Sequence, residues 1–379
     1  MKASRIAVFS LIFLFSLSSL AVFGQVAPPS KPEPGKPAAK PAPKLGLPKE
    51  IRAIIQEGLV TRQGRRDIPF TIFKAMEFPV PGGMHTVLFF KARNSDLGYA
   101  APLPVRQGKS ATPPAAASAN VLEARLVAAL EFLQPDETGA LKASREMGFP
   151  VTLQTDSAGY DPAKEEWYTL GVSLPFGKYT VGMFFAGVEP KTGKPDMRKV
   201  GVSYYDVNLP GPETYQNALE TTPLFFARDI RQMESYEGKP VIHRNFFTYS
   251  VLQFVPNIDS VVTAEDNSQI EVFFVILGAK EAVVDSAAQP ESPKYSIETS
   301  YELQKEDGTP VIKWETKKSA SQYISQPLPL KQTKITTDAA GKQSTEQSAI
   351  PAGKYVLVVK VTDLLSGFSV DKKVPFELK

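Results

Sequence analysis

The hydrophobic positions of this chain fall into short runs rich in β-branched and aromatic residues, which predict β-strands. The clearest runs are Phe70–Phe73, Thr86–Phe90, Tyr179–Val181, Val251–Phe254, Glu271–Ile276 and Tyr355–Val359. Only one segment, Glu50–Leu59, predicts a helix, because its isoleucines recur at helical spacing. The pattern therefore predicts an all-β fold with one short N-terminal helix.

Four segments lack a clear strand pattern. Val121–Leu133 fits a helix by its Leu, Ala and Glu content and a strand by its place in the chain, so both interpretations stay open. Three others predict loops or long hairpin tips because proline, glycine and small polar residues dominate them: Leu97–Asn120, Ala279–Pro293 and Thr316–Ser348.

An internal repeat is the most informative feature. The run Leu-Pro-Phe-Gly-Lys-Tyr that ends at Tyr179 matches Ile-Pro-Ala-Gly-Lys-Tyr ending at Tyr355. A Phe-Phe pair precedes each run at a similar distance, namely Phe89 with Phe90 and Phe273 with Phe274. Two copies of one module of about 160 residues explain this order.

The start of the chain predicts export. A basic start at Lys2 and Arg5 precedes an apolar run, as in a signal peptide, and cleavage is expected before Gln25. Retention of the run as a membrane anchor is the alternative, because its length approaches that of a spanning helix. Residues 25–49 are rich in Pro, Lys and Ala and predict an extended linker.

These boundaries predict five parts. Residues 1–24 form the signal peptide and residues 25–49 the disordered linker. A first β-sandwich covers residues 50–210, a short linker covers 211–222, and a second β-sandwich covers 223–379.

The repeated Pro-x-Gly-Lys-Tyr segment resembles the tyrosine corner of immunoglobulin-like and fibronectin type III sandwiches. In that corner a Tyr hydroxyl returns to nearby backbone at the entry to a late strand. It also resembles a segment of transthyretin-like accessory modules. The resemblance implies two tandem immunoglobulin-like β-sandwiches that support, space or bind, and it predicts buried, hydrogen-bonded rings for Tyr179 and Tyr355.

A broader resemblance covers most of the chain after the linker. Residues 67–70, 90–98, 255–258 and 353–367 look like the tandem β-sandwich region that accompanies von Willebrand A-related domains in exported bacterial proteins. The A domain is absent, and no Asp-x-Ser-x-Ser sequence occurs. This resemblance implies a periplasmic or secreted location and carries no specific activity.

Composition narrows the chemistry. The chain has no cysteine, which excludes thiolate catalysis and cysteine zinc sites. Its net charge of +3 is small and dispersed, unlike that of nucleic-acid-binding domains. Its two histidines, His85 and His243, belong to no catalytic or zinc motif and are expected to be structural.

The remaining candidates are acids and aromatics. Acidic residues gather at Asp161, Glu165 and Glu166 and again at Glu265 and Asp266, and solvated turns are the expected interpretation. Neighbours in a strand point to opposite faces, so one Phe of each adjacent pair must leave its own core. That Phe is expected to be covered within the chain, yet it is also a candidate anchor for a partner. Trp167 and Trp314 are expected to pack in the core or at an edge of a sandwich, and a platform for a glycan is the alternative for each.

The sequence thus predicts a non-catalytic exported scaffold or protein-interaction protein of the cell envelope. Its expected partner is another envelope or secreted protein. The alternative is a carbohydrate-binding accessory module with a polysaccharide ligand. No catalytic, cofactor-binding or metal-binding residue is assigned, and no transmembrane segment is expected in the mature chain.

Overall fold

The computed structural model describes residues 46–101, 120–190, 192–234, 240–263, 269–282, 294–337 and 343–379. The predicted signal peptide, almost all of the first linker and the acids Glu265 and Asp266 lie outside these residues. None of the helices in the described ranges has the length and apolar character needed to cross a bilayer.

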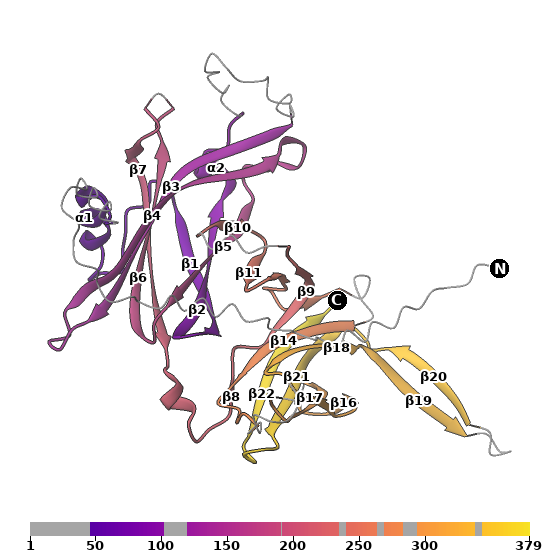
Figure 1. The fold of residues 1–379 in the computed structure, drawn as a ribbon. Coiled ribbons are helices and arrows are strands. Elements are labelled where there is room, and N and C mark those ends of the chain that lie inside the picture. The colour runs from indigo at the N-terminus through magenta and orange to yellow at the C-terminus, as the bar shows by residue number, and fades with distance from the viewer. Residues whose placement is uncertain are drawn as a thin grey trace. The chain divides into compact units, whose positions relative to one another are not determined.

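The all-β prediction is confirmed, and most strands belong to two pairs of sheets (Figure 1). The first pair, called here the N-terminal pair, has one sheet in the order β1-β2-β5-β10 and another in the order β4-β3-β6-β7. The bounds of the first sheet are Phe70–Val80 (β1), Gly83–Arg93 (β2), Glu165–Leu174 (β5) and Ile242–Arg244 (β10). Those of the second are Val121–Pro135 (β3), Leu141–Asp156 (β4), Gly177–Val188 (β6) and Pro195–Leu209 (β7).

The second pair, called the C-terminal pair, has two six-stranded sheets. In the first, β8 (Glu220–Thr221), β9 (Phe225–Gln232), β11 (Phe247–Tyr249), β12 (Leu252–Pro256), β14 (Gln269–Leu277) and β18 (Tyr323–Pro329) take the order β11-β12-β9-β14-β18, and β8 pairs with β14. In the second, β13 (Val261–Val262), β15 (Ile297–Lys305), β16 (Pro310–Lys313), β17 (Lys317–Ser319), β21 (Gly353–Asp363) and β22 (Ser369–Leu378) take the order β13-β22-β21-β15-β16, and β17 pairs with β15.

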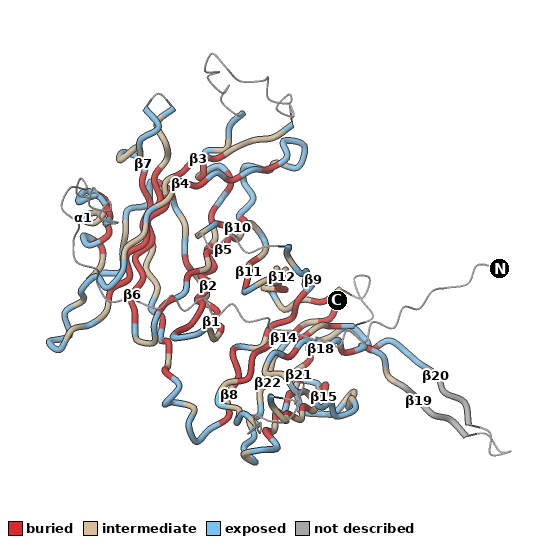
Figure 2. The backbone as a smooth tube through the Cα atoms, viewed as in Figure 1, coloured by how far each residue is buried: buried red, intermediate tan, exposed pale blue. Residues whose placement is uncertain are grey.

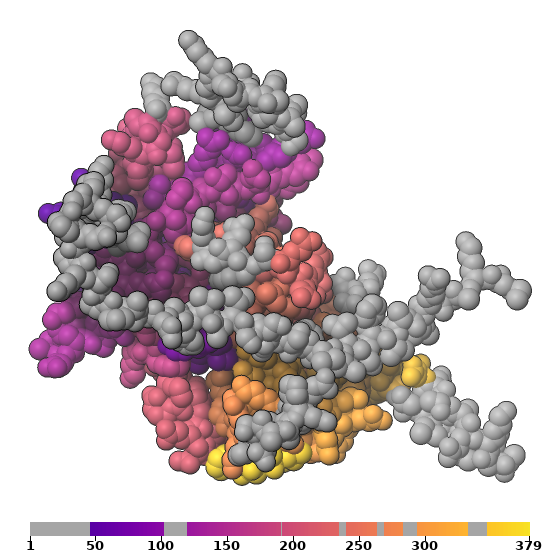
Figure 3. Space-filling model, in the orientation of Figure 1, coloured from indigo at the N-terminus to yellow at the C-terminus, as the bar shows by residue number. Residues whose placement is uncertain are grey.

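The other elements are short. Helix α1 (Lys49–Glu57) confirms the predicted helix and packs on the outer face of the β4-β3-β6-β7 sheet, where Ile51 and Ile55 cover Phe184. The rest are α2 (Asn94–Leu97), the 3₁₀ turns η1 (Ser157–Gly159) and η2 (Pro212–Tyr215), and the two-stranded hairpin of β19 (Lys331–Thr337) and β20 (Gln343–Ala349). In the space-filling view the β3–β4 hairpin end projects at the left of the surface (Figure 3).

The repeat predicted from the sequence appears as a repeated topology. In both pairs three strands, β1-β2-β5 or β9-β14-β18, face four others, β4-β3-β6-β7 or β16-β15-β21-β22, in matching chain order. In a constant-type immunoglobulin domain the fourth strand lies beside the fifth, whereas here it lies beside the third. Each sheet pair is therefore sandwich-like, and its fourth strand belongs to the opposite sheet from that in a constant-type immunoglobulin domain.

Each sheet pair encloses its own apolar core, and buried residues appear as red stretches along its strands in Figure 2. The tyrosine corner occurs in both. The Tyr179 hydroxyl donates a hydrogen bond of 3.0 Å to the Pro175 carbonyl, and the Tyr355 hydroxyl donates one of 2.6 Å to the Pro351 carbonyl. Both rings are buried, as predicted.

A third cluster, called here the shared cluster, joins the two pairs. It contains Met76, Phe78, Val87 and Phe89 from β1 and β2, together with Phe225, Phe247, Tyr249, Phe254 and Phe273 from the C-terminal sheet. The chain also crosses back, because β10 follows β9 in sequence but pairs with β5 of the N-terminal pair. The two sheet pairs thus share a core, and the second half of the chain contributes strand β10 to the N-terminal pair.

Two sequence expectations needed tertiary information. Val121–Leu133 is part of strand β3, so the helical alternative is wrong, because sheet pairing outweighs local propensity. Of the loop or long hairpin expected over Thr316–Ser348, β19 and β20 form a hairpin, but the segment also contains β18, which pairs with β14 along the whole length of β18. Pro327 and Pro329 argued against a strand in the sequence. Both are tolerated because β18 is the end strand of its sheet.

Candidate functional site

The outward phenylalanines of the two repeated pairs, Phe89 and Phe273, do not reach solvent. Phe89 is 0% exposed and packs against Phe247, while Phe273 is 2% exposed and lies against Phe78 and Phe254. The expected cover within the chain is therefore confirmed for Phe89 and Phe273. Their use as anchors for a partner is wrong, because the shared cluster already occupies both faces.

The two histidines are structural and lie apart. The ring of His85 is 4% exposed, and its Nε2 lies 3.2 Å from the Thr248 carbonyl, which fixes Nε2 as the donor. Nδ1 then accepts from the Ser173 hydroxyl at 3.3 Å. His243 pairs with Thr169, four residues from Ser173 along β5, or about 13 Å. Burial lowers the pKa of both rings.

The first acidic group does not form a site. Asp161 caps a turn by accepting from the Ala163 N–H at 2.9 Å, and Glu165 is exposed, both as expected of solvated turns. Glu166 differs, because it is 4% exposed and pairs with Arg244 of β10 and with Lys164. Burial alone would raise the pKa of Glu166, but these hydrogen bonds outweigh it and the pKa falls.

The two tryptophans have different surroundings. Trp167 packs against Phe89 at the edge of the shared cluster, so it contributes to the contact between the two sheet pairs. Trp314 is partly exposed and lines a pocket of about 340 Å³ with Tyr301 and Gln326. Both rings are partly buried, and Trp314 is the one that lines this pocket.

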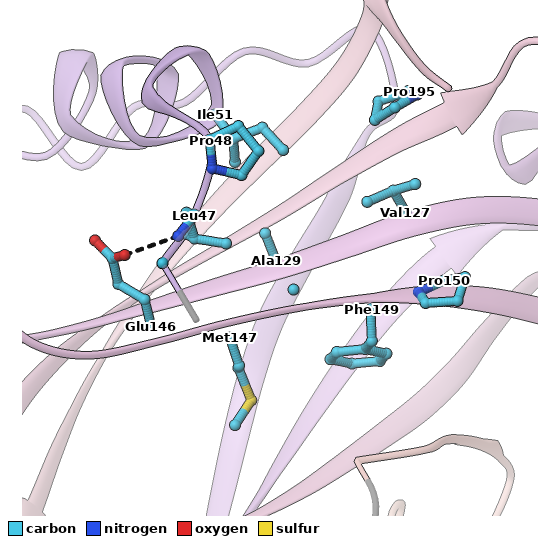
Figure 4. A pocket seen from close by; sticks show the side chains of 12 residues that line it. Leu47, Pro48, Ile51, Val127, Ala129, Glu146, Met147, Phe149, Pro150 and Pro195 are labelled. Carbon is cyan, nitrogen blue, oxygen red and sulfur yellow. Dashed lines mark hydrogen bonds between the residues drawn. The ribbon is translucent and has the colours of Figure 1, made fainter. Parts of the chain in front are cut away.

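A second hollow, called here the α1 groove, has a volume of about 310 Å³ and lies on the outer face of the β4-β3-β6-β7 sheet (Figure 4). Its floor carries the small residues Ala129 and Gly148, and the N-terminal segment walls one side. The lining comprises Gly46, Leu47, Pro48, Ile51, Val127, Ala129, Glu146, Met147, Gly148, Phe149, Pro150 and Pro195. Met147 and Phe149 turn to the opposite side of β4 (Figure 4), and both pack against the sandwich core.

One end of the α1 groove carries an acidic and a basic side chain that pair with each other. Glu146 accepts two hydrogen bonds from Arg52, at 2.6 and 2.8 Å, and one of 2.9 Å from the Leu47 N–H. The Arg52 contact holds the pKa of Glu146 below its usual value. These bonds tie the segment before α1 to β4, so they hold the groove wall in place.

Under α1 lies a buried acid that the sequence did not single out. Glu131 is 0% exposed, and Oε1 accepts from Gln56 Nε2 at 2.9 Å. Burial raises the pKa of Glu131, so the carboxyl holds its proton more readily. The sequence signal that could have revealed Glu131 is the presence of an acidic residue within the apolar run of β3. In the part of the chain that the structure describes, no three acidic or histidine side chains gather as a metal site would require.

The α1 groove was also missed by sequence reasoning. Its lining comes from four separate segments, at Gly46–Ile51, Val127–Ala129, Glu146–Pro150 and Pro195. None of these segments carries a recognisable motif. The one signal was the run of small residues at 128 and 129 inside an otherwise bulky strand.

No protein-family model matches this sequence, and a search of the curated proteins finds no match. The resemblance to the accessory region of von Willebrand A-related proteins therefore stays a prediction.

Proposed function

We propose that this chain is a non-catalytic scaffold or binding protein of the cell envelope, and that the α1 groove holds an extended peptide segment of another envelope or secreted protein. The observation that carries the proposal is the apolar lining of the groove over a floor of small residues. Ligand sites are mostly concave and apolar, with few polar groups that fix orientation.

The shape of the groove favours a peptide in extended form. Gly148 is exposed and has no side chain, so a backbone can approach the sheet closely there, whereas Ala129 beneath it is already covered. Leu47, Pro150 and Pro195 offer apolar contacts around this floor to alternate side chains of a bound strand.

The neighbouring strand adds hydrogen-bonding capacity. β4 ends its sheet, and within the described ranges no strand pairs with its outer edge. An edge strand of this kind presents unpaired backbone groups, which are a common means of peptide capture. Residues 151–156 of β4 lack proline and alternate buried with exposed positions, so this half of the edge suits pairing best.

The sequence supports the proposed location. A signal peptide over residues 1–24 and a proline-rich linker over 25–49 are typical of proteins that act outside the cytoplasm. The carbohydrate-binding alternative has separate support, in the pocket beside Trp314.

Site-specific photo-crosslinking tests the proposal. A benzophenone amino acid at Val127 should crosslink one partner in intact cells, at a site within an extended segment of that partner. The matched control is Val60, which is apolar and 94% exposed but lies away from the groove. Equal capture from both positions, or none from position 127 in the folded protein, would refute the proposal.

The identified segment gives a second test as a synthetic peptide. Val127→Glu places a charge on the groove lining and should weaken binding of the peptide at least tenfold, whereas Val60→Glu should leave it unchanged. Because Val127 is only half-buried, its replacement leaves the core intact. Unchanged affinity of the Val127→Glu variant would contradict the assignment.

A further inference from the structure

A pocket of about 340 Å³ opens at the edge of the C-terminal pair, remote in sequence from the α1 groove. It lies where β18 of one sheet meets β15, β16 and β17 of the other. The lining residues are Tyr301, Trp314, Glu315, Lys317, Gln326, Pro327, Leu328 and Pro329.

Two hydrogen bonds fix the indole of Trp314 in this pocket. Its Nε1 donates to the Pro329 carbonyl at 3.1 Å, which links the two sheets. Its backbone N–H donates to the Tyr301 carbonyl at 3.1 Å. Because the indole N–H is already used, Trp314 offers the pocket an apolar ring and no free donor.

Tyr301 borders the pocket without offering it a hydrogen-bonding group. It is 1% exposed and belongs to the core of the C-terminal pair, and its hydroxyl is buried. Burial raises the pKa of Tyr301 to about 12, so the hydroxyl keeps its proton. The polar groups that a ligand can reach therefore lie at the rim.

The rim is polar and balanced in charge. Glu315 and Lys317 lie 3.6 Å apart, with side chains 92% and 50% exposed. Gln326 uses its amide N–H on the Pro327 carbonyl at 2.9 Å, which leaves its carbonyl oxygen as an acceptor. One negative and one positive group at the rim favour a neutral ligand with many hydroxyls over a charged one.

We propose that this pocket is a saccharide-binding site in which Trp314 contacts the apolar face of a neutral sugar ring and Gln326, Glu315 and Lys317 bind its hydroxyls. A pyranose has one C–H-rich face and a rim of donors and acceptors, which matches an aromatic surface bordered by polar groups. The site goes beyond the proposed peptide-binding function, since it shares no residue with the α1 groove.

The tryptophan content makes a direct measurement possible. The chain has two tryptophans, so Trp167→Phe leaves Trp314 as the sole indole emitter. Maltose, cellobiose and N,N′-diacetylchitobiose are titrated to tens of millimolar into this variant. At least one should shift the emission saturably to shorter wavelength. The control variant, Trp314→Phe, keeps Trp167 and should show no saturable change.

Gln326→Leu separates binding from folding. Because Gln326 is only partly buried, its replacement should change the stability little, whereas affinity for the responding sugar should fall about fivefold through loss of one hydrogen bond. Val127→Glu, in the α1 groove, should leave sugar binding unaffected, so the failure of one site is distinguishable from that of the other. No response to any of the three sugars, or an equal response from the Trp314→Phe variant, would overturn the proposal.

Discussion

Phe89 and Phe273 hold the same position in the two copies of the repeat, and both turn into one shared aromatic cluster. Each follows its strand pattern, because the next residue, Phe90 or Phe274, enters the core of its own sheet pair. The repeat therefore produces two outward rings that cover one another's sheets. This relationship explains why neither ring is available to a partner.

The shared cluster should contribute strongly to stability. Phe89→Ala is expected to lower the free energy of unfolding by about 3–5 kcal/mol, because it leaves a cavity among buried rings. Phe368→Ala, at a ring 39% exposed, should change it by less than about 0.5 kcal/mol. Urea denaturation followed by fluorescence compares the two. Similar values for both variants would mean that the cluster is not tightly packed.

A cut between the two halves should not separate them. Residues 212–218 are mostly exposed, so limited proteolysis should nick the chain there. The shared cluster and the β10–β5 pairing should then hold the fragments together. Size-exclusion chromatography should show one species of native size, and denaturing electrophoresis two bands. Two separately eluting, folded fragments would instead indicate independent domains.

The tyrosine corners should contribute equally in both copies. Tyr179→Phe and Tyr355→Phe each remove one hydroxyl hydrogen bond and should cost about 0.5–1.5 kcal/mol. Replacement by Ala also leaves a cavity and should cost about 3–5 kcal/mol. Chemical denaturation of the four variants checks this. Neutral Tyr→Phe changes at both positions would show that the corner hydrogen bonds carry no net stability.

Protonation of His85 should lower the stability of the folded protein at mildly acidic pH. Burial lowers its pKa in the folded state below the value of about 6.5 in the unfolded chain, so the unfolded state binds the proton more tightly. Stability is therefore complete above about pH 6.5 and falls as the pH drops through that value. His85→Gln should flatten the dependence between pH 7.5 and 5.5 in denaturation experiments.

Burial also lowers the pKa of His243, which supplies a second slope of the same sign that remains in that variant. Carboxylates with lowered pKa values, such as Glu146, lose their contribution only below about pH 4.5 and do not interfere. An unchanged pH dependence in the His85→Gln variant would contradict this assignment.

The Glu166–Arg244 ion pair should hold β10 in place beside β5. Arg244→Met removes the cation and leaves Glu166 buried with only Lys164 as its ionic partner, so it should cost about 3–5 kcal/mol. The double variant with Glu166→Gln should recover part of that loss, because the unpaired charge is gone. A double-mutant cycle by denaturation measures the coupling, and additive effects would exclude it.

The sequence by itself determined the β-class, the presence of helix α1 and the two tyrosine corners. These features depend on local chemistry: alternation within a strand, isoleucine spacing in a helix, and a proline–glycine turn that places a Tyr four residues from its acceptor. Such signals lie within a few residues of one another and are readable without the fold. The repeat also followed directly from matching local segments.

Tertiary structure alone decided where the two hollows lie and which aromatics stay exposed. Trp167 and Trp314 look alike in sequence, yet one joins the shared cluster and the other borders a pocket. The α1 groove and the pocket beside Trp314 are each assembled from several segments, and β10 returns to pair with β5 across the chain. These arrangements depend on which faces of distant strands cover one another, because burial is set by contacts between sheets and local pattern fixes only which residues share a face.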